Sequence, residues 1–172
     1  MIDVDFSLAI NNRTGKYYLG LDIVNEIAGK IDTIHYGRFS SISNNDFFRR
    51  VQGRIYHWEI LLRVGRFKNT LPLRKSLNPV LHLDPLTVLN WELKESDVVV
   101  CHDIGPITHP DYFSKNVDVL YREVYEKISR TGCNMVFVSE ATKAEFIRHY
   151  GTRFSSLKVA YIPIREGLLS HG

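Results

Sequence analysis

The chain has 172 residues, 44% of them hydrophobic, and a formal net charge of +3, which excludes a disordered chain and favours one globular domain. No stretch approaches the roughly 18 apolar residues that a membrane span needs, and Asp3 and Asp5 interrupt the N-terminus where a secretion signal requires an apolar core. We therefore expect a cytoplasmic protein in which Cys101 and Cys133 are reduced, buried thiols, because two cysteines are too few for a disulfide framework.

The first half of the chain predicts a strand, a glycine turn and a helix. Apolar residues alternate with polar or smaller ones over residues 2–10, which is the periodicity of a strand. After a polar turn over residues 11–15, apolar residues recur at helical spacing until Gly29, which is placed to end the helix. Two further strands, 31–36 and 80–83, and one long helix, 44–68, are predicted by the same criteria.

The most informative stretch of the sequence is residues 97–109. Val98–Cys101 is a continuous apolar run, typical of a strand buried on both faces of a parallel sheet. His102 and Asp103 follow where this run stops, and ligands of open α/β sheets bind outside the carboxyl ends of strands. These two side chains are therefore the first candidates for a functional site, although a histidine bonded to backbone and an aspartate capping a turn explain them equally well.

The rest of the chain alternates helices with strands. An amphipathic helix is predicted over 117–128, and a buried strand over 135–138, followed by Ser139 as a helix N-cap and Gly151 as the C-cap. A last strand is predicted at 159–162. Strands that alternate with helices of ten or more residues predict an α/β fold, a doubly wound and mostly parallel sheet in a three-layer, Rossmann-like domain.

Familiar nucleotide and metal motifs are absent from the sequence. Gly15 and Gly20 do not make the glycine fingerprint of a dehydrogenase, and no Walker A lysine follows a glycine-rich loop. Gly15 can either make the turn alone or let a phosphate approach the backbone at a helix N-terminus. His102, Asp103 and His109 lack the spacing of a metal site, so we expect no metal.

Three segments together resemble the N-terminal domain of retaining GT-B glycosyltransferases of family 4. They are Thr14-Gly15 at the start of the first helix, the loop 102–113 with its His-Asp, His-Pro and Tyr-Phe pairs, and the Val-Ser-Glu-Ala-Thr segment 138–142. The resemblance runs from the first strand to the end of the chain, while residues 40–76 match only in architecture. Residues 1–162 would then be one half of a GT-B fold, the acceptor-side domain, and 163–172 the start of the interdomain linker.

The resemblance implies an enzyme that moves a sugar from a nucleotide sugar, such as a UDP- or GDP-sugar, to a lipid-linked or polysaccharide acceptor in cell-surface glycan synthesis. It implies no metal or other cofactor. Thr14 and Gly15 would lie near the donor diphosphate, and His102 would reach the transferred sugar. Asp103 would orient its loop, and Ser139 would cap a helix that faces the cleft. Family members bind the nucleotide sugar on a second, C-terminal domain, so residues 1–172 alone are expected to be inactive.

The predicted helix 44–68 lies in a strongly basic region. Residues 44–75 carry eight basic and two acidic side chains, against a net charge of +3 for the whole chain. An apolar stripe accompanies Arg49, Arg50 and Arg54, and basic amphipathic helices often lie on anionic membranes. The helix therefore either attaches the protein to the inner face of the plasma membrane or packs its stripe on the sheet like an ordinary surface helix.

Two further interpretations concern binding partners. Nucleic acid is disfavoured because no recognised binding motif accompanies the basic charge. The alternative to a glycosyltransferase is a non-catalytic α/β module, which would bind a partner through the same cleft or through the basic helix.

Overall fold

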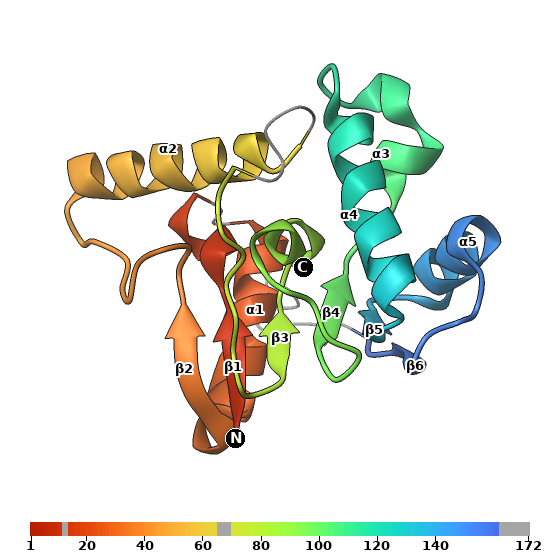
Figure 1. The fold of residues 1–172 in the computed structure, drawn as a ribbon, viewed down its shortest axis with the longest axis horizontal. Coiled ribbons are helices and arrows are strands. Elements are labelled where there is room, and N and C mark those ends of the chain that lie inside the picture. The colour runs from red at the N-terminus through yellow and green to blue at the C-terminus, as the bar shows by residue number, and fades with distance from the viewer. Residues whose placement is uncertain (12–13, 65–69, 162–172) are drawn as a thin grey trace, which may run out of the picture.

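The protein, described by a computed structural model over residues 1–11, 14–64 and 70–161, contains one six-stranded parallel sheet (Figure 1). The strands are β1 (Ile2–Asp5), β2 (Ile31–His35), β3 (Val80–His82), β4 (Val98–Cys101), β5 (Asn134–Phe137) and β6 (Ser156–Val159). The helices are α1 (Gly15–Glu26), α2 (Asp46–Leu62), α3 (Gly105–Thr108), α4 (Val117–Thr131) and α5 (Glu140–Tyr150).

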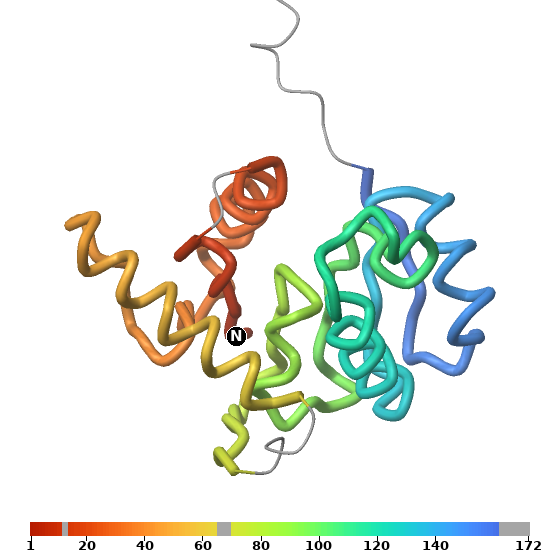
Figure 2. The backbone as a smooth tube through the Cα atoms, turned by 90° about the horizontal axis from the view of Figure 1, so that it is seen from above, coloured from red at the N-terminus to blue at the C-terminus, as the bar shows by residue number. Residues whose placement is uncertain are grey.

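The sheet carries a hydrophobic core on each face, because neighbouring residues of a strand point to opposite sides. In β4, Val99 and Cys101 belong to a core shared with α4 and α5, whereas Val100 belongs to a second core shared with α1. Figure 2 shows α1 on one side of the sheet and α4 on the other. This arrangement confirms the three-layer, Rossmann-like α/β fold that the sequence predicts.

The strand order β2-β1-β3-β4-β5-β6 changes direction between β1 and β3. The chain leaves β1 through α1 toward β2 on one side, while all later strands are added on the other side. In doubly wound sheets the loops at such a switch point diverge and leave a crevice at the carboxyl ends of the two strands, where ligands bind. A ligand site is therefore expected at the segments that follow β1 and β3.

Two predicted strands differ from the structure by more than one residue at an end. The first ends at Asp5 rather than at Ile10, because the Asp5 carboxylate accepts hydrogen bonds from the backbone N–H and the hydroxyl of Ser7. These bonds turn the chain into the short 3-10 helix η1 (Ser7–Ile10). The last strand begins earlier than predicted, at Ser156, and its pairing with β5 ends at Val159, where its partner strand also ends. Residue 162 of the predicted strand lies outside the described residues.

The long helix is shorter than predicted and faces the other way. α2 begins after Asn45, whose side chain accepts hydrogen bonds from two first-turn N–H groups, and ends at Leu62; residues 65–68 of the prediction lie outside the described part. Six apolar side chains of α2 are exposed to solvent, namely Phe47, Phe48, Val51, Ile55, Trp58 and Leu61. The opposite side of the helix faces the domain, and its buried side chains include that of Glu59. The interpretation that the apolar stripe packs on the sheet is therefore wrong.

Both cysteines are free and buried, as the sequence predicts. Cys101 ends β4 and Cys133 precedes β5, so the two thiols lie at opposite ends of neighbouring strands. Burial raises the pKa of each thiol to about 12. Both groups are consequently protonated at physiological pH.

His82, at the end of β3, is fully buried in the neutral form. Its Nδ1 lies 2.8 Å from Thr87 Oγ1, and the Thr87 hydroxyl itself donates to the Asp84 carbonyl. Nδ1 therefore carries the proton, and the buried Nε2 has no hydrogen-bond partner in the part of the chain that the structure describes. A second proton would place an unsolvated charge in the core, and this burial lowers the pKa of His82 to about 3.

We expect His82 to make the fold sensitive to acid. Its pKa is lower in the folded state than the ordinary value near 6.5, so its contribution to stability is complete above that value. The contribution is lost as pH falls from about 6.5 toward 3. Between pH 7.5 and pH 5 the loss amounts to about 2 kcal/mol in the free energy of unfolding. Urea unfolding at the two pH values, on the wild type and on His82→Gln, isolates this effect. An equal pH dependence for both proteins would contradict it.

Candidate functional site

The loops that follow β1, β3 and β4 are joined at the carboxyl edge of the sheet by one lysine. Lys16 lies in the first turn of α1, with its Nζ 3.7 Å from Asp84 Oδ2 and 3.6 Å from Asp103 Oδ2. Asp84 follows β3 and Asp103 follows β4. The structure thus brings the predicted His-Asp loop next to the helix that Gly15 begins, beside the switch point of the sheet.

His102 is a neutral imidazole, and one of its two ring nitrogens is already hydrogen-bonded. Its Nε2 lies 2.9 Å from the carbonyl oxygen of Leu83. Because a carbonyl can only accept, Nε2 carries the proton and Nδ1 keeps a lone pair. Burial lowers the pKa of His102, and the nearby Asp84 carboxylate only partly opposes this effect. The side chain is therefore oriented by backbone and presents a hydrogen-bond acceptor at neutral pH.

Asp103 fixes the loop in which it lies. Its Oδ1 accepts a hydrogen bond from the backbone N–H of Gly105 at 3.0 Å, and its backbone carbonyl accepts one from the Tyr125 hydroxyl at 2.8 Å. The carboxylate is about half exposed, so its other oxygen can pair with Lys16 across the edge of the sheet. These contacts suit a positioning role for Asp103.

The start of α1 is open on the side of Gly15. Thr14 is the N-cap residue, with extended backbone angles, and Gly15 is the first helical residue. A Cβ placed on Gly15 would lie more than 4 Å from every atom of the described residues outside its immediate chain neighbours. Neither packing nor a left-handed backbone demands glycine here, so the turn alone does not explain Gly15. A ligand could approach the backbone N–H groups of the first turn at this position.

Ser139 is the N-cap of α5, as predicted. Its Oγ accepts a hydrogen bond from the backbone N–H of Thr142 at 3.1 Å, which satisfies one of the first N–H groups of the helix. The residue follows β5, the strand next to β4, at the same edge of the sheet. Its nearness to a donor stays a prediction.

Sequence reasoning missed Lys16 and Asp84. Asp84 follows a predicted strand in the same way as His102 does, so the position of a polar residue after an apolar run was a usable signal. The pairing of both aspartates with Lys16 depends on the strand order, which the sequence does not state. Two carboxylates and one ammonium group give this cluster a formal charge of −1. Any diphosphate bound here would need additional positive charge from elsewhere.

No protein-family model, curated protein or solved structure matches this chain. Among the described residues, no three His, Cys, Asp or Glu side chains are arranged to hold a metal ion. Nor does any helix within the described ranges have both the length and the apolar character needed to cross a membrane.

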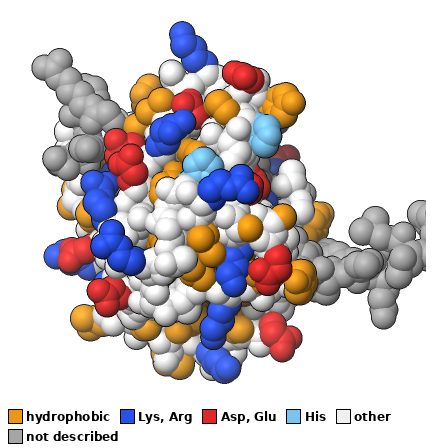
Figure 3. Space-filling view, turned by 90° about the vertical axis from the view of Figure 1, so that its right-hand side faces the viewer, with side chains coloured by type: hydrophobic (Ala, Val, Ile, Leu, Met, Phe, Trp, Pro, Cys, Tyr) orange, Lys and Arg blue, Asp and Glu red, His pale blue; other side chains and the backbone are white. Residues whose placement is uncertain are grey.

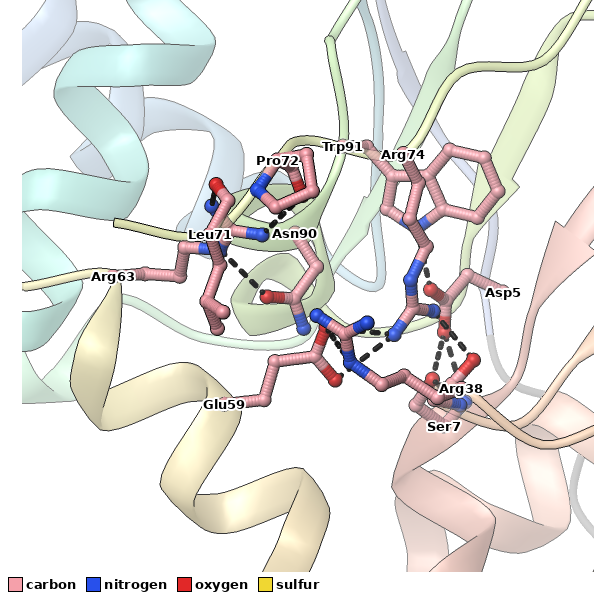
Figure 4. A network of polar contacts seen from close by, with 11 residues as sticks. Asp5, Ser7, Arg38, Glu59, Arg63, Leu71, Pro72, Arg74, Asn90 and Trp91 are labelled. Carbon is pink, nitrogen blue, oxygen red and sulfur yellow. Dashed lines mark hydrogen bonds and ion pairs between the residues drawn. The ribbon is translucent and has the colours of Figure 1, made fainter. Parts of the chain in front are cut away.

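A buried polar network attaches α2 to the carboxyl edge of the sheet (Figure 4). Both carboxylate oxygens of Glu59 lie 2.9 Å from Arg74 Nη2, and one lies 3.3 Å from Arg38 Nε. Arg63, directly after the helix, donates to Asn90 Oδ1 at 3.2 Å and to the backbone carbonyls of Leu71 and Pro72. These bonds account for the orientation of α2, because its charged inner side chains find their partners in the domain.

A second part of the network lies deeper, beside the switch point. Asp5 Oδ2 accepts a hydrogen bond from Trp91 Nε1 at 2.6 Å, and the Ser7 hydroxyl in turn accepts one from the Gly37 N–H. The Arg74 guanidinium lies over the Trp91 ring at 5.8 Å from its centre. The segment after β1 is thus connected to the same residues that hold α2.

The three predicted arginines of α2 do not share one surface. Arg49 pairs with Asp46 at 2.6 Å and is partly buried. Arg50 and Arg54 are exposed and line a hollow of about 350 Å³ together with Asn11, Gly53, His57 and Trp58. Helical geometry separates Arg49 from Arg50 by roughly a quarter of a turn and from Arg54 by roughly two fifths of a turn. Arg50, Arg54 and His57 therefore share one face of the helix, and Arg49 does not line the hollow. The membrane role expected of the three arginines stays a prediction.

Proposed function

We propose that residues 1–172 form the acceptor-side half of a retaining glycosyltransferase, which moves a sugar from a nucleotide sugar to a lipid-linked or polysaccharide acceptor. The observation that carries the proposal is the meeting of the His102-Asp103 loop with the open start of α1, bridged by Lys16. The two segments are far apart in sequence and both belong to the family resemblance. They meet at the edge of the sheet where ligands bind in open α/β domains.

The chemistry of the site suits the recognition of a sugar. A neutral His102, held through Nε2, can accept a hydrogen bond from a sugar hydroxyl through Nδ1. The first-turn N–H groups beside Gly15 can contribute to binding of the diphosphate leaving group. Asp84 and Asp103 oppose such an anion, so the donor half must supply most of the positive charge. This division of labour supports a site that is completed by a second domain.

The proposal is tested by sugar transfer with the full-length native protein. Radiolabelled UDP-sugars and GDP-sugars are offered with lipid and polysaccharide fractions, and we expect one donor class to label one fraction. Calorimetry on residues 1–172 should show little or no binding of the same donors. Micromolar binding by this chain alone would contradict the assignment of the nucleotide site to the other half.

Replacing Gly15 by Leu separates the two explanations of this glycine. Because a side chain here meets no atom within 4 Å, the free energy of unfolding should change little. Turnover in the full-length enzyme should fall about tenfold or more, because the side chain would displace a diphosphate from the first turn of α1. Gly29→Leu is the matched control, since its Cβ position is equally open. Equal turnover for both variants would leave Gly15 as a turn residue.

A further inference from the structure

The outer surface of α2 combines exposed apolar side chains with arginines that form no ion pair with any described residue. Phe47, Phe48 and Trp58 are 69%, 59% and 63% exposed, and Val51, Ile55 and Leu61 continue the same face. The helix contains only two acidic residues, and both are occupied elsewhere: Asp46 pairs with Arg49, and Glu59 is buried against Arg74. Nothing acidic on α2 therefore offsets Arg50 and Arg54 on this surface.

A basic hollow adjoins the apolar face. It has a volume of about 350 Å³ and lies between α2 and Asn11 of the segment that follows η1, with Arg50, Arg54 and His57 in its wall. Among the described residues that line it, none is acidic. Two guanidinium groups in one wall repel each other unless an anion lies between them. A phosphate group has ample room, since a water molecule occupies only about 30 Å³ of liquid.

The orientation of α2 is held from the inside, so the exposure of its apolar face does not result from loose packing. Glu59 and Arg63 hold the inner side through ion pairs and hydrogen bonds to three separate segments, which contain Arg38, residues 72–74 and Asn90. Gly53 allows close contact, because a Cβ there would lie 1.9 Å from Asn11 Oδ1. Rotating the helix to bury its aromatic residues would break this network.

We propose that α2 docks the domain onto an anionic membrane surface. The face formed by Phe47, Val51, Ile55 and Trp58 enters the bilayer interface, and the hollow beside it binds the phosphate of a lipid headgroup through Arg50 and Arg54. Interfacial helices combine these features, with aromatic and aliphatic residues on one side and basic residues beside them. This proposal stands independently of the glycosyltransferase proposal, because it uses none of the residues at the carboxyl ends of β3 and β4.

A lipid surface explains the face better than a second copy of this chain does. A two-fold interface brings the same patch of both subunits together, so Arg50 and Arg54 would meet their own equivalents or lie close to them. Like charges placed together oppose association, whereas an anionic surface attracts them. The opposite end of the molecule differs, since basic and acidic side chains are interspersed there and hydrophobic ones are scattered (Figure 3).

Co-sedimentation of residues 1–172 with phosphatidylcholine vesicles, with and without phosphatidylglycerol, tests the proposal. We expect binding that requires phosphatidylglycerol and weakens with added salt. Arg50→Gln combined with Arg54→Gln should lower the partition coefficient about 25-fold at low salt, or about fivefold for each charge near an anionic surface. The matched control removes two exposed arginines from α4 and α5, Arg122→Gln with Arg148→Gln, and should bind nearly as well as the wild type.

Tryptophan fluorescence gives a second and independent measurement. The chain has two tryptophans, and Trp91 is fully buried, so a blue shift on adding vesicles reports Trp58. Trp58→Phe should lose the shift and still sediment with phosphatidylglycerol vesicles. Circular dichroism confirms that the variants fold, which is expected because all these side chains are exposed.

Four results would overturn the proposal. They are equal binding to neutral vesicles, equal loss of binding in the control pair, absence of the blue shift despite sedimentation, and a concentration-dependent dimer that the Arg50 and Arg54 changes abolish while vesicles bind nothing. Calorimetry with inorganic phosphate distinguishes a free anion from a lipid. Tight phosphate binding without any vesicle binding would assign the hollow to a soluble phosphate.

Discussion

Replacing Glu59 by Ala is expected to lower the free energy of unfolding by about 3–5 kcal/mol, because it leaves buried charge without its partner. The carboxylate is almost completely buried and contacts Arg74 and Arg38 on one side of α2. Both guanidinium groups would lose their carboxylate, and Arg74, itself mostly buried, could not recover full solvation. Urea unfolding of wild type and variant measures the effect.

A surface ion pair provides the control for Glu59. Glu145 and Arg148 lie 2.8 Å apart on α5. Arg148 is well exposed and Glu145 is partly exposed, so Glu145→Ala should cost less than about 1 kcal/mol. Glu59→Gln keeps the shape and part of the hydrogen bonding, so its cost should lie between the two. If Glu59→Ala cost no more than the surface change, the network would not hold α2 in place.

Replacing His102 by Ala should lower turnover of the full-length enzyme about a hundredfold or more, the usual cost of losing a hydrogen-bonding group directed at the reacting sugar. The side chain lies at the edge of the sheet and makes one hydrogen bond, to the Leu83 carbonyl. Its loss should therefore cost the fold little compared with its effect on catalysis. Steady-state kinetics and thermal unfolding of the same preparations separate the two effects.

His109 offers a matched control for His102. It lies seven residues later, exposed, with its ring stacked on Tyr112 at 5.8 Å between centres and its Nδ1 2.8 Å from the Thr108 hydroxyl. His109→Ala should leave most of the turnover intact. Unchanged turnover in His102→Ala would contradict its role at the sugar, and loss of folding would support a purely structural histidine.

Much of the fold could be predicted because strands that are buried on both faces have a simple pattern. The apolar run Val98–Cys101 forms β4 as predicted. Ser139 and Gly151 cap the two ends of α5, also as predicted. The alternation of apolar and polar residues over 2–10 predicted too long a strand, because it reflects side-chain polarity and not local hydrogen bonds. The carboxylate of Asp5 ends the strand through a local hydrogen bond to Ser7, and alternation does not register such a bond.

The orientation of α2 could not be predicted from its own sequence. Amphipathic spacing identifies two faces of a helix and does not say which one meets the protein. The face that packs against the domain is determined by Arg38, Arg74 and Asn90, which are distant in sequence and bind the inner side of the helix. The candidate site shows the same limit, since His102 and Gly15 could be identified singly, whereas their connection through Lys16 depends on strand order.

The reactivity of the two buried thiols can report local opening of the structure. Cys101 and Cys133 are fully shielded and protonated, so a maleimide reaches them only when the surrounding structure opens. They lie at opposite ends of neighbouring strands, one near the candidate site and one at the far edge. Mass spectrometry of the labelled peptides would therefore time the opening of the two edges separately, without any introduced cysteine.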